Sequence, residues 1–437
     1  MLTHEEKISR ISHQLKKRKS KSPISLKKKA VTHQVPKPGD QTDLDEKIDV
    51  SDLNKILHID HKKKICVAEP GVTFVDLVQA TLKHNLVPIV VPELKTITIG
   101  GAVAGCSIES MSYHRGGFHD NCLEYEVITA KGEVLICRPD NEHALIFQMM
   151  HGTFGTLGII TKLTFKLVPA KPFVKVVYEK YPTLDAYKKA IWSHYQNQDV
   201  DFMDGIIHSP SEWVLSVGQF VDEAPYHHAY DWMRIYYLST KKRKEDYLKT
   251  ADYFFRYDKG VTNVMPKSFL GRLLFGKFLN SGNELRFFQR IKRFLPSRMI
   301  PVTVDLFIPF SKATEFMEWY QKEINFFPLW CVPYQINHRY EWISKEVFKH
   351  HHDKLFLDLA IYGLKKHPKK NYHQIIEQEL MKIGGVKTLI SENYYSEVEF
   401  WRTWNKENYE AIKQKTDPDN IFRGLYEKMC RVTRGLA

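Results

Sequence analysis

Residues 92–132 read PELKTITIGGAVAGCSIESMSYHRGGFHDNCLEYEVITAKG, and they decide the fold class. No charged residue occurs between Lys95 and Glu109, and small residues in this stretch surround three glycines: Gly100, Gly101 and Gly105. Glycine lets a backbone approach a ligand closely, and successive bare N–H groups can form a concave nest for a diphosphate. The stretch then leads, with no helix following at once, into an alternating strand at 125–129 and a turn at 131–132. It therefore differs from a Rossmann fingerprint and from a P-loop.

This glycine stretch resembles the diphosphate loop of the flavoprotein superfamily of vanillyl-alcohol oxidase and p-cresol methylhydroxylase. Within it, IGGAVAGCSIES followed by GGFHD is similar to the delta-24 sterol reductase group. Five more segments resemble that group in the same order: VAEPGVTFVDL (67–77), GTLGIITKLTFKLVPAK (155–171), FFPLWCVPY (326–334), LFLDLAIYG (355–363) and EFWRTW (399–404). The resemblance thus covers nearly the whole chain.

The resemblance implies an α+β fold with a bipartite FAD-binding domain and an α/β cap. At 437 residues the chain is also too long for one ordinary core. We expect the FAD-binding domain at 1–171, with two subdomains split near residue 90. Strands alternating with longer helices over 172–385 favour an antiparallel sheet covered on one face by helices, which would be the cap. Residues 386–437 are expected to be helical and to return to the FAD-binding domain.

Charge, cysteine content and hydropathy limit the partners, the compartment and the membrane character that we expect for this protein. The net charge of +13 favours anionic partners, and no nucleic-acid-binding signature accompanies it. Six cysteines without a CxxC pair indicate reduced thiols in a cytoplasmic protein. The sequence shows no secretory segment and no apolar run of about 18 residues, so we expect no membrane span and none of the N-terminal anchor of eukaryotic sterol reductases. No metal is expected, because the adjacent His350, His351 and His352 would point in different directions on a helix.

The resemblance implies noncovalent FAD, with Cys106 and His114 as the residues to examine for a covalent link. We expect three groups of residues to bind the cofactor: the glycine stretch, the segment after it, and GTFGTLGII at 152–160. The predicted residues are Thr96, Thr98, Ile99, Gly100, Gly101, Ala102, Gly105, Ser107, Ser110, Asp120, Asn121, Gly155, Leu157, Gly158 and Ile160. Near the N-terminus, KKKAVTH at 27–33 replaces the usual glycine-rich turn. Its lysines suit either a diphosphate contact or a solvated basic loop.

Because a flavin carries out hydride transfer itself, we searched for groups that position substrate or move a proton. In the second half of this stretch, His114 and His119 could donate a proton near neutral pH, although a structural, hydrogen-bonded histidine is the more common role for each. Their charged and polar neighbours complete this candidate set: Glu109, Tyr113 and Arg115. In the expected cap, YFFRYDK at 253–259 offers Arg256 and Asp258 as catalytic candidates. Its cations Arg256 and Lys259 could hold a nicotinamide phosphate or orient substrate, or form an ordinary salt-bridged loop.

The sequence predicts hydride transfer between reduced flavin and a carbon–carbon double bond of a sterol-like or other lipid, with NADPH as candidate reductant. Val261-Thr262-Asn263 stands where sterol reductases have an aromatic pair, which leaves the substrate open. Two alternatives remain: an oxidase or dehydrogenase of a sugar, alcohol or aldonolactone, and a flavin-binding adaptor without turnover. Residues 268–300 interleave rings with basic groups. That pattern suits peripheral contact with an anionic membrane or packing on the cap.

Overall fold

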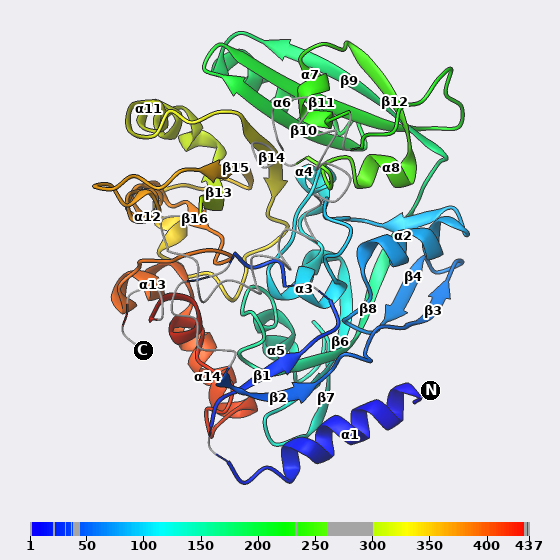
Figure 1. Ribbon diagram of the computed structural model, residues 1–437, viewed down its shortest axis with the longest axis vertical. Coiled ribbons are helices and arrows are strands. Elements are labelled where there is room, and N and C mark those ends of the chain that lie inside the picture. Colours follow the sequence, from blue (N-terminus) through cyan, green and yellow to red (C-terminus); the bar gives the residue numbers. More distant parts are fainter. Residues whose placement is uncertain are drawn as a thin grey trace.

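The computed structural model describes residues 2–20, 22–30, 32–35, 37, 44–231, 234–260, 300–431 and 435. Two large sheets, with helices around them, form the upper and lower halves of Figure 1. The predicted mixture of helices and sheets is confirmed. The domain boundaries near 171 and 385, and the assignment of a cap, stay predictions.

The lower half is built on a six-stranded sheet. Its strands run in the order β3-β4-β8-β6-β7, with β5 paired to β8. The bounds are β3 Ile56–Asp60, β4 Ile65–Ala68, β5 Leu86–Pro88, β6 Cys122–Ile128, β7 Val134–Cys137 and β8 Ile159–Pro169. A small parallel sheet of β1 (Ile24–Lys27) and β2 (Glu46–Asp49) lies beside it (Figure 1). The predicted hairpin is confirmed, because β6 pairs antiparallel with β7 and Gly132 takes the positive φ of the turn.

Local signals explain the helices of this half. α1 (His4–Lys16) begins with a capping box between Thr3 and Glu6 and buries Ile8, Ile11 and Leu15, which lie on one helical face. α2 (Phe74–Leu82) begins after Thr73, whose side chain accepts a hydrogen bond from the backbone N–H of Asp76. α5 is a short helix, Ala144–Met149.

The backbone conformation of the glycine stretch differs from the predicted loop. Residues Ile99–Ala104 form a short helix, α3, where we expected a loop. Thr98 caps it, and Ile99, Ala102 and Val103 are buried on one side. The apolar spacing i, i+3, i+4 therefore outweighs the low helix propensity of two glycines. A second short helix, α4 (Ser112–Arg115), precedes β6.

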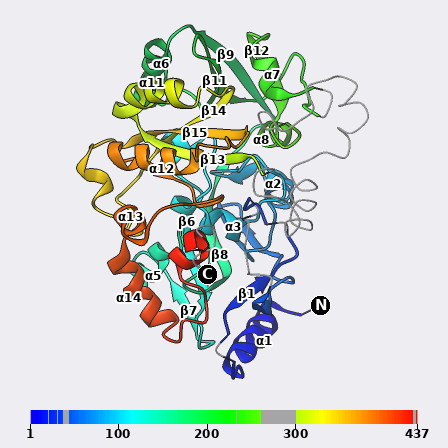
Figure 2. The same cartoon turned by 60° about the vertical axis from the view of Figure 1, so that its left-hand side comes forward.

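The upper half is an eight-stranded antiparallel sheet, in the order β12-β9-β11-β10-β14-β15-β13-β16. The bounds are β9 Phe173–Tyr181, β10 Phe202–Ser209, β11 Glu212–Val221, β12 Glu245–Lys249, β13 Val302–Pro309, β14 Leu329–Gln335, β15 Leu355–Leu364 and β16 Val386–Lys387. Figure 2 shows three helices along one side of these strands: α6 (Leu184–Asn197), α11 (Ala313–Glu323) and α12 (Tyr372–Ile383). A separate apolar cluster joins them to that sheet face, including Ile191, Phe316 and Leu380.

The opposite face of the eight-stranded sheet meets the lower half. One apolar cluster contains Phe165 from β8, Ile206 from β10 and Trp330 from β14, so both sheets share a core. α7 (Tyr236–Thr240) and α8 (Thr250–Phe254) lie near the β12 edge, and α13 (Glu397–Thr403) and α14 (Lys406–Thr416) return along the lower half (Figure 1).

Two expectations concern the membrane. Among the described residues, no helix has both the length and the apolar character needed to cross a bilayer. The basic and aromatic segment lies, except for Ile300, outside the described residues, as does Val261-Thr262-Asn263. Membrane contact through that segment stays a prediction.

Candidate functional site

A deep cleft of about 830 Å³ opens between the two halves of the molecule. Its wall comes from separated segments of the chain: the lysine loop, the glycine stretch, the loop after α5, the lower face of the eight-stranded sheet and the C-terminal region. Of the predicted cofactor residues, eight line it: Thr98, Gly100, Gly101, Gly105, Ser107, Gly155, Gly158 and Ile160. The volume lies in the usual range for ligand sites, roughly 300–1,000 Å³.

Gly100 and Gly101 meet different surroundings on this wall. A Cβ at Gly100 would lie 2.5 Å from Cβ of Pro70, whereas one at Gly101 would meet only Oγ1 of Thr98, at 3.2 Å. Gly101 is exposed to the cleft. Gly155 has a φ of +70°, and a Cβ there would meet open space. Gly101 and Gly155 therefore keep the cleft wide, while Gly100 lets α3 pack against its neighbour.

The predicted nest of bare N–H groups is wrong. The N–H of Ile99 donates to the carbonyl of Val72, and that of Gly100 to the carbonyl of Pro70. The N–H groups of Gly101 and Ala102 donate to Thr98. Hydrogen bonds to Pro70, Val72 and Thr98 therefore occupy these donors. What the stretch offers a cofactor is close approach at Gly101 and the hydroxyls of Thr98 and Ser107.

Basic groups face the glycine helix across the cleft. Lys27, Lys28 and Lys29 all line the wall, and their contact with a diphosphate stays a prediction. Lys27 already pairs with Asp49 at 2.8 Å, while Lys28 and Lys29 are exposed. His33 also lines the cleft and hydrogen-bonds Oγ1 of Thr96 at 3.0 Å. Thr96 is thus one layer behind the wall.

Six other predicted cofactor residues do not line the cleft, and each has a structural reason. Three are apolar and fully buried in the core shared by the sheets: Ile99, Ala102 and Leu157. Ser110 is buried and accepts a hydrogen bond from the hydroxyl of Tyr253. Asp120 accepts from the N–H of Gly117, and the amide of Asn121 donates to the carbonyls of Arg115 and Gly117. These polar residues hold the loop before β6.

Neither candidate histidine reaches the cleft. His114 packs on the ring of Tyr113, and burial lowers its pKa to about 4. His119 is fully buried among the rings of His151, Tyr340 and Trp342, and burial lowers its pKa as well. Both imidazoles are therefore neutral at physiological pH, and neither is positioned to protonate a ligand in the cleft.

Arg256 is the centre of a buried ion cluster. Its guanidinium lies 2.9 Å from the Glu109 carboxylate and 3.0 Å from that of Asp204, and it stacks on the ring of Tyr253 at 4.0 Å. Asp204 also accepts hydrogen bonds from Tyr257 and from the indole of Trp330, which lines the cleft. The cluster thus lies one layer behind the wall, and the expectation that Arg256 faces the ligand is corrected.

Asp258, the other candidate of this segment, is buried and accepts a hydrogen bond from the backbone N–H of Lys95 at 3.1 Å. It ties the turn after α8 to the segment that enters the glycine stretch. Its contact is structural, because it does not line the cleft.

The sequence reasoning missed the acids of the cleft. Four carboxyl residues of the described chain line it: Asp45, Glu93, Asp305 and Asp358. Asp45 pairs with Arg423 at 2.7 Å. Asp305 in β13 and Asp358 in β15 each interrupt an apolar run, in TVDLFIPF and LFLDLAIYG, and that interruption was the available signal.

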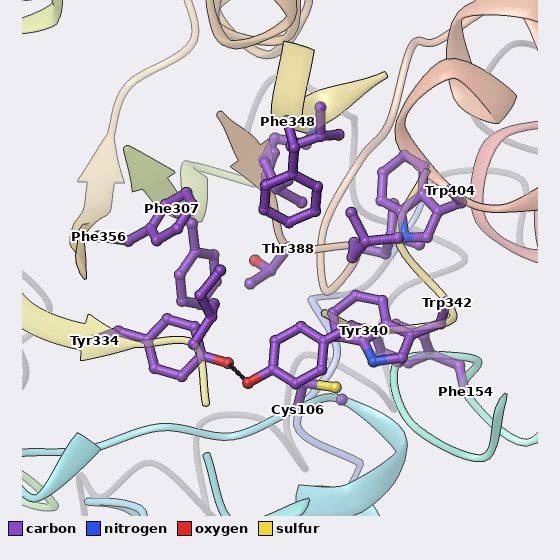
Figure 3. A pocket seen from close by; sticks show the side chains of 18 residues that line it. Cys106, Phe154, Phe307, Tyr334, Tyr340, Trp342, Phe348, Phe356, Thr388 and Trp404 are labelled. Carbon is purple, nitrogen blue, oxygen red and sulfur yellow. Dashed lines mark hydrogen bonds between the residues drawn. The ribbon is translucent and has the colours of Figure 1, made fainter. Parts of the chain in front are cut away.

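An aromatic pocket of about 80 Å³ adjoins the cleft. Figure 3 shows Phe348, Trp404 and Trp342 around it, with the hydroxyls of Tyr334 and Tyr340 hydrogen-bonded at 2.5 Å. Almost all of its lining is apolar. Five residues line both spaces and mark their junction: Gly105, Cys106, Phe154, Phe307 and Thr388. Since a buried water needs ~10–15 Å³ on this measure, the pocket has room for a group of several carbon atoms.

Residues 32–138, which supply the glycine helix and part of the cleft wall, match the family described as FAD binding domain. Over most of its length the chain is also similar to sterol reductases. It is 25% identical to the Delta(24)-sterol reductase of Homo sapiens over 410 residues, 87% of this chain and 77% of that protein. It is 24% identical to the Delta(24)-sterol reductase homolog dhcr-24 of Caenorhabditis elegans over 427 residues, 89% and 79% of the two chains. The Delta(24)-sterol reductase of Pisum sativum is 23% identical over 439 residues, 87% of this chain and 76% of that protein. The predicted resemblance is thereby confirmed.

Proposed function

We propose that the protein is a reductase that uses noncovalently bound FAD and NADPH to saturate a carbon–carbon double bond of a sterol-like or other lipid. The observation that carries the proposal is the junction of two unlike spaces. A polar cleft, lined by much of the glycine stretch, meets an apolar aromatic pocket at Cys106 and Phe307. A hydrocarbon group fits the pocket, whereas a sugar or aldonolactone would leave its hydroxyls largely unpaired there.

The residues of the cleft fit FAD. Gly101 and Gly155 leave space along the wall, and Lys28 and Lys29 can supply positive charge for a diphosphate, with the pKa of Lys28 lowered by burial within the cleft. Burial raises the pKa of the Cys106 thiol well above its usual value, so this cysteine is a poor nucleophile for a covalent link. When bound, FAD supplies two-electron hydride chemistry.

The side chains around the junction of cleft and pocket exclude water and position the hydrocarbon. Phe154 and Phe307 flank the junction of cleft and pocket, and the pocket beyond them is almost wholly apolar. Such a lining excludes water from the reacting carbons and fixes the hydrocarbon by shape. The hydroxyl pair of Tyr334 and Tyr340 is held by Asp120, which accepts from Tyr340 at 2.8 Å, so this polar feature is anchored in place.

The proposal is tested by following the flavin colour of the purified protein in the absence of oxygen. NADPH should bleach the flavin of the purified protein, and a sterol with a side-chain double bond should restore its colour. Reduction by a sugar acid with rapid re-oxidation by oxygen would instead establish an oxidase. Absence of bleaching with any donor would leave only an adaptor.

Phe348→Asn sharpens this experiment, because Phe348 is only half-buried and its ring lines the aromatic pocket. An unpaired amide there should slow lipid reduction by about tenfold or more, with FAD content and reduction by NADPH unchanged. The control is Trp192→Asn, which removes a ring from α6 on the far side of the eight-stranded sheet. Equal lipid reduction by both variants would show that the pocket does not bind substrate.

A further inference from the structure

The lower face of the eight-stranded sheet carries two acids into the cleft. In the antiparallel pairing of β13 and β15, Asp358 lies opposite Phe307, and Asp305 lies opposite Ala360. Residues two apart on a strand share a face, so Asp305, Phe307 and Asp358 point the same way. Because Phe307 lines both the cleft and the aromatic pocket, the acids stand at the junction of the two spaces. Glu93, near the start of the glycine stretch, also lines the cleft and completes the group.

The three carboxyl groups differ in their hydrogen-bond partners. Asp305 accepts hydrogen bonds from the hydroxyl of Tyr362 at 2.5 Å and from that of Thr388 at 3.4 Å. Asp358 is 3% exposed, and its Oδ1 has no hydrogen-bond partner within the described residues. A buried carboxyl oxygen without a protein partner, on the wall of a ligand cleft, is available to a ligand.

The charges around the group favour protons on two of its members. Burial raises the pKa of Glu93 to about 8, helped by Glu109 and Asp305 and opposed by Arg256. Burial, with Asp305 and Glu93 nearby, also raises the pKa of Asp358 well above its usual value, opposed by a hydrogen bond with the backbone of Leu306. Burial raises the pKa of Asp305 to about 6, while its two hydroxyl donors stabilise the anion. Near neutral pH this arrangement favours the negative charge on Asp305 and protons on Asp358 and Glu93.

An isolated carbon–carbon double bond needs such an acid. It has no adjacent carbonyl to accept electrons, so a hydride can add to one carbon only if a proton adds to the other. In water at neutral pH a carboxylic acid is ionised; in this cleft, burial and like charge keep one protonated.

We propose that Asp358 is the proton donor of the reduction, with Glu93 returning a proton to it; this rests on the proposed function. The O–H bond of Asp358 breaks, and the π electron pair of the alkene forms a C–H bond with that proton. A hydride from reduced flavin, itself regenerated by NADPH, forms the second C–H bond. The alkene gains two electrons and two hydrogens, and the Asp358 carboxylate is reprotonated from water through Glu93.

Asp358→Asn tests the role, because an amide has nearly the same shape and cannot give up a proton as a carboxylic acid does. FAD content and reduction by NADPH should be unchanged, while re-oxidation of the reduced flavin by alkene should slow about 100-fold or more. The control is Asp246→Asn, a buried carboxylate in β12 that hydrogen-bonds His228 and Tyr230 and does not line the cleft. Its rate per folded holoenzyme should match that of the wild type.

A second readout needs no turnover. The infrared carbonyl band of a protonated carboxyl should be present in the apoprotein at neutral pH and should weaken in Asp358→Asn. Alkene re-oxidation at the wild-type rate in Asp358→Asn, or an unchanged infrared band, would overturn the donor role. If no alkene re-oxidises even the wild type, the proposed function fails and the donor role with it; a wild type and variant of equal activity disprove the donor role alone.

The pH profile follows from the same arrangement. A proton donor works only when protonated, so alkene reduction should be constant below about pH 8 and fall above it, where Glu93 ionises. Glu93→Gln cannot relay a proton, and it should lower the rate and remove this fall from the profile. A wild-type rate that rises above about pH 8 would contradict the relay.

Discussion

At the scale of single residues, Gly100 and Gly101 have different roles: Gly100 allows close packing against Pro70, and Gly101 leaves space in the cleft. We predict that Gly101→Val abolishes FAD binding and leaves the melting temperature of the apoprotein nearly unchanged, because the side chain enters the cleft. Gly100→Ala should instead destabilise the fold by about 1–2 kcal/mol, since overpacking against Pro70 exceeds the gain in helix propensity. Flavin absorbance after gel filtration and thermal unfolding of the apoproteins measure the two effects. Stoichiometric FAD in Gly101→Val would refute the placement of the cofactor.

Arg256 gives a second prediction at this scale, and it reverses the expectation drawn from the sequence. Alanine at this position leaves Glu109 and Asp204 buried without their cation. We expect a loss of about 3–5 kcal/mol in unfolding free energy, measured by urea denaturation. Lys171→Ala, which breaks an exposed pair with Asp222, should cost about 0–1 kcal/mol. Comparable costs for the two variants would mean that the Arg256 cluster does not stabilise the fold.

At the scale of elements, α1 is fastened to the six-stranded sheet by a charged histidine. His4 lies 3.0 Å from Glu69 and 2.8 Å from Glu126, and its hydrogen bonds to Glu126 and Glu69 raise its pKa to about 9. A raised histidine pKa stabilises the fold fully below the unfolded value, and the stabilisation is lost as pH rises through the folded value.

His4→Gln should therefore lower the free energy of unfolding by up to about 3 kcal/mol near pH 6, and by much less near pH 10. Denaturant titrations at the two pH values measure the difference. His13→Gln, at an exposed position of the same helix, is the control and should show no such dependence. A pH-independent cost for His4→Gln would show that the histidine is uncharged in the folded state.

Some elements are determined by local sequence signals, whereas others depend on contacts between distant residues. Alternation and the turn signal predicted the β6–β7 hairpin, because it depends on neighbours within the chain. Helix α3 was missed, since its stability comes from burying Ile99 and Val103 against distant residues rather than from propensity. The acids of the cleft were missed for a related reason. Only the register between β13 and β15 places Asp305 beside Asp358, and one sequence does not reveal that register.

At the scale of the whole molecule, a single core joins the two sheets. The same apolar cluster includes Phe165 of the six-stranded sheet, Ile206 of the eight-stranded sheet and Met429 near the C-terminal end. The sheets therefore cannot separate without exposing this shared core. The cleft crosses the same boundary, because its wall contains Gly101 from below and Trp330 from above.

We therefore predict that the protein unfolds in one cooperative transition and that FAD stabilises both sheets together. Free FAD at about 100 times its Kd should add about 2.7 kcal/mol to the free energy of unfolding. Hydrogen exchange measures this element by element: the most protected amides of β8 and β10 should open with one free energy, and FAD should raise it equally in both. Two separate transitions, or protection that FAD confers on β8 alone, would show that the halves fold independently and that the cofactor is bound by only one of them.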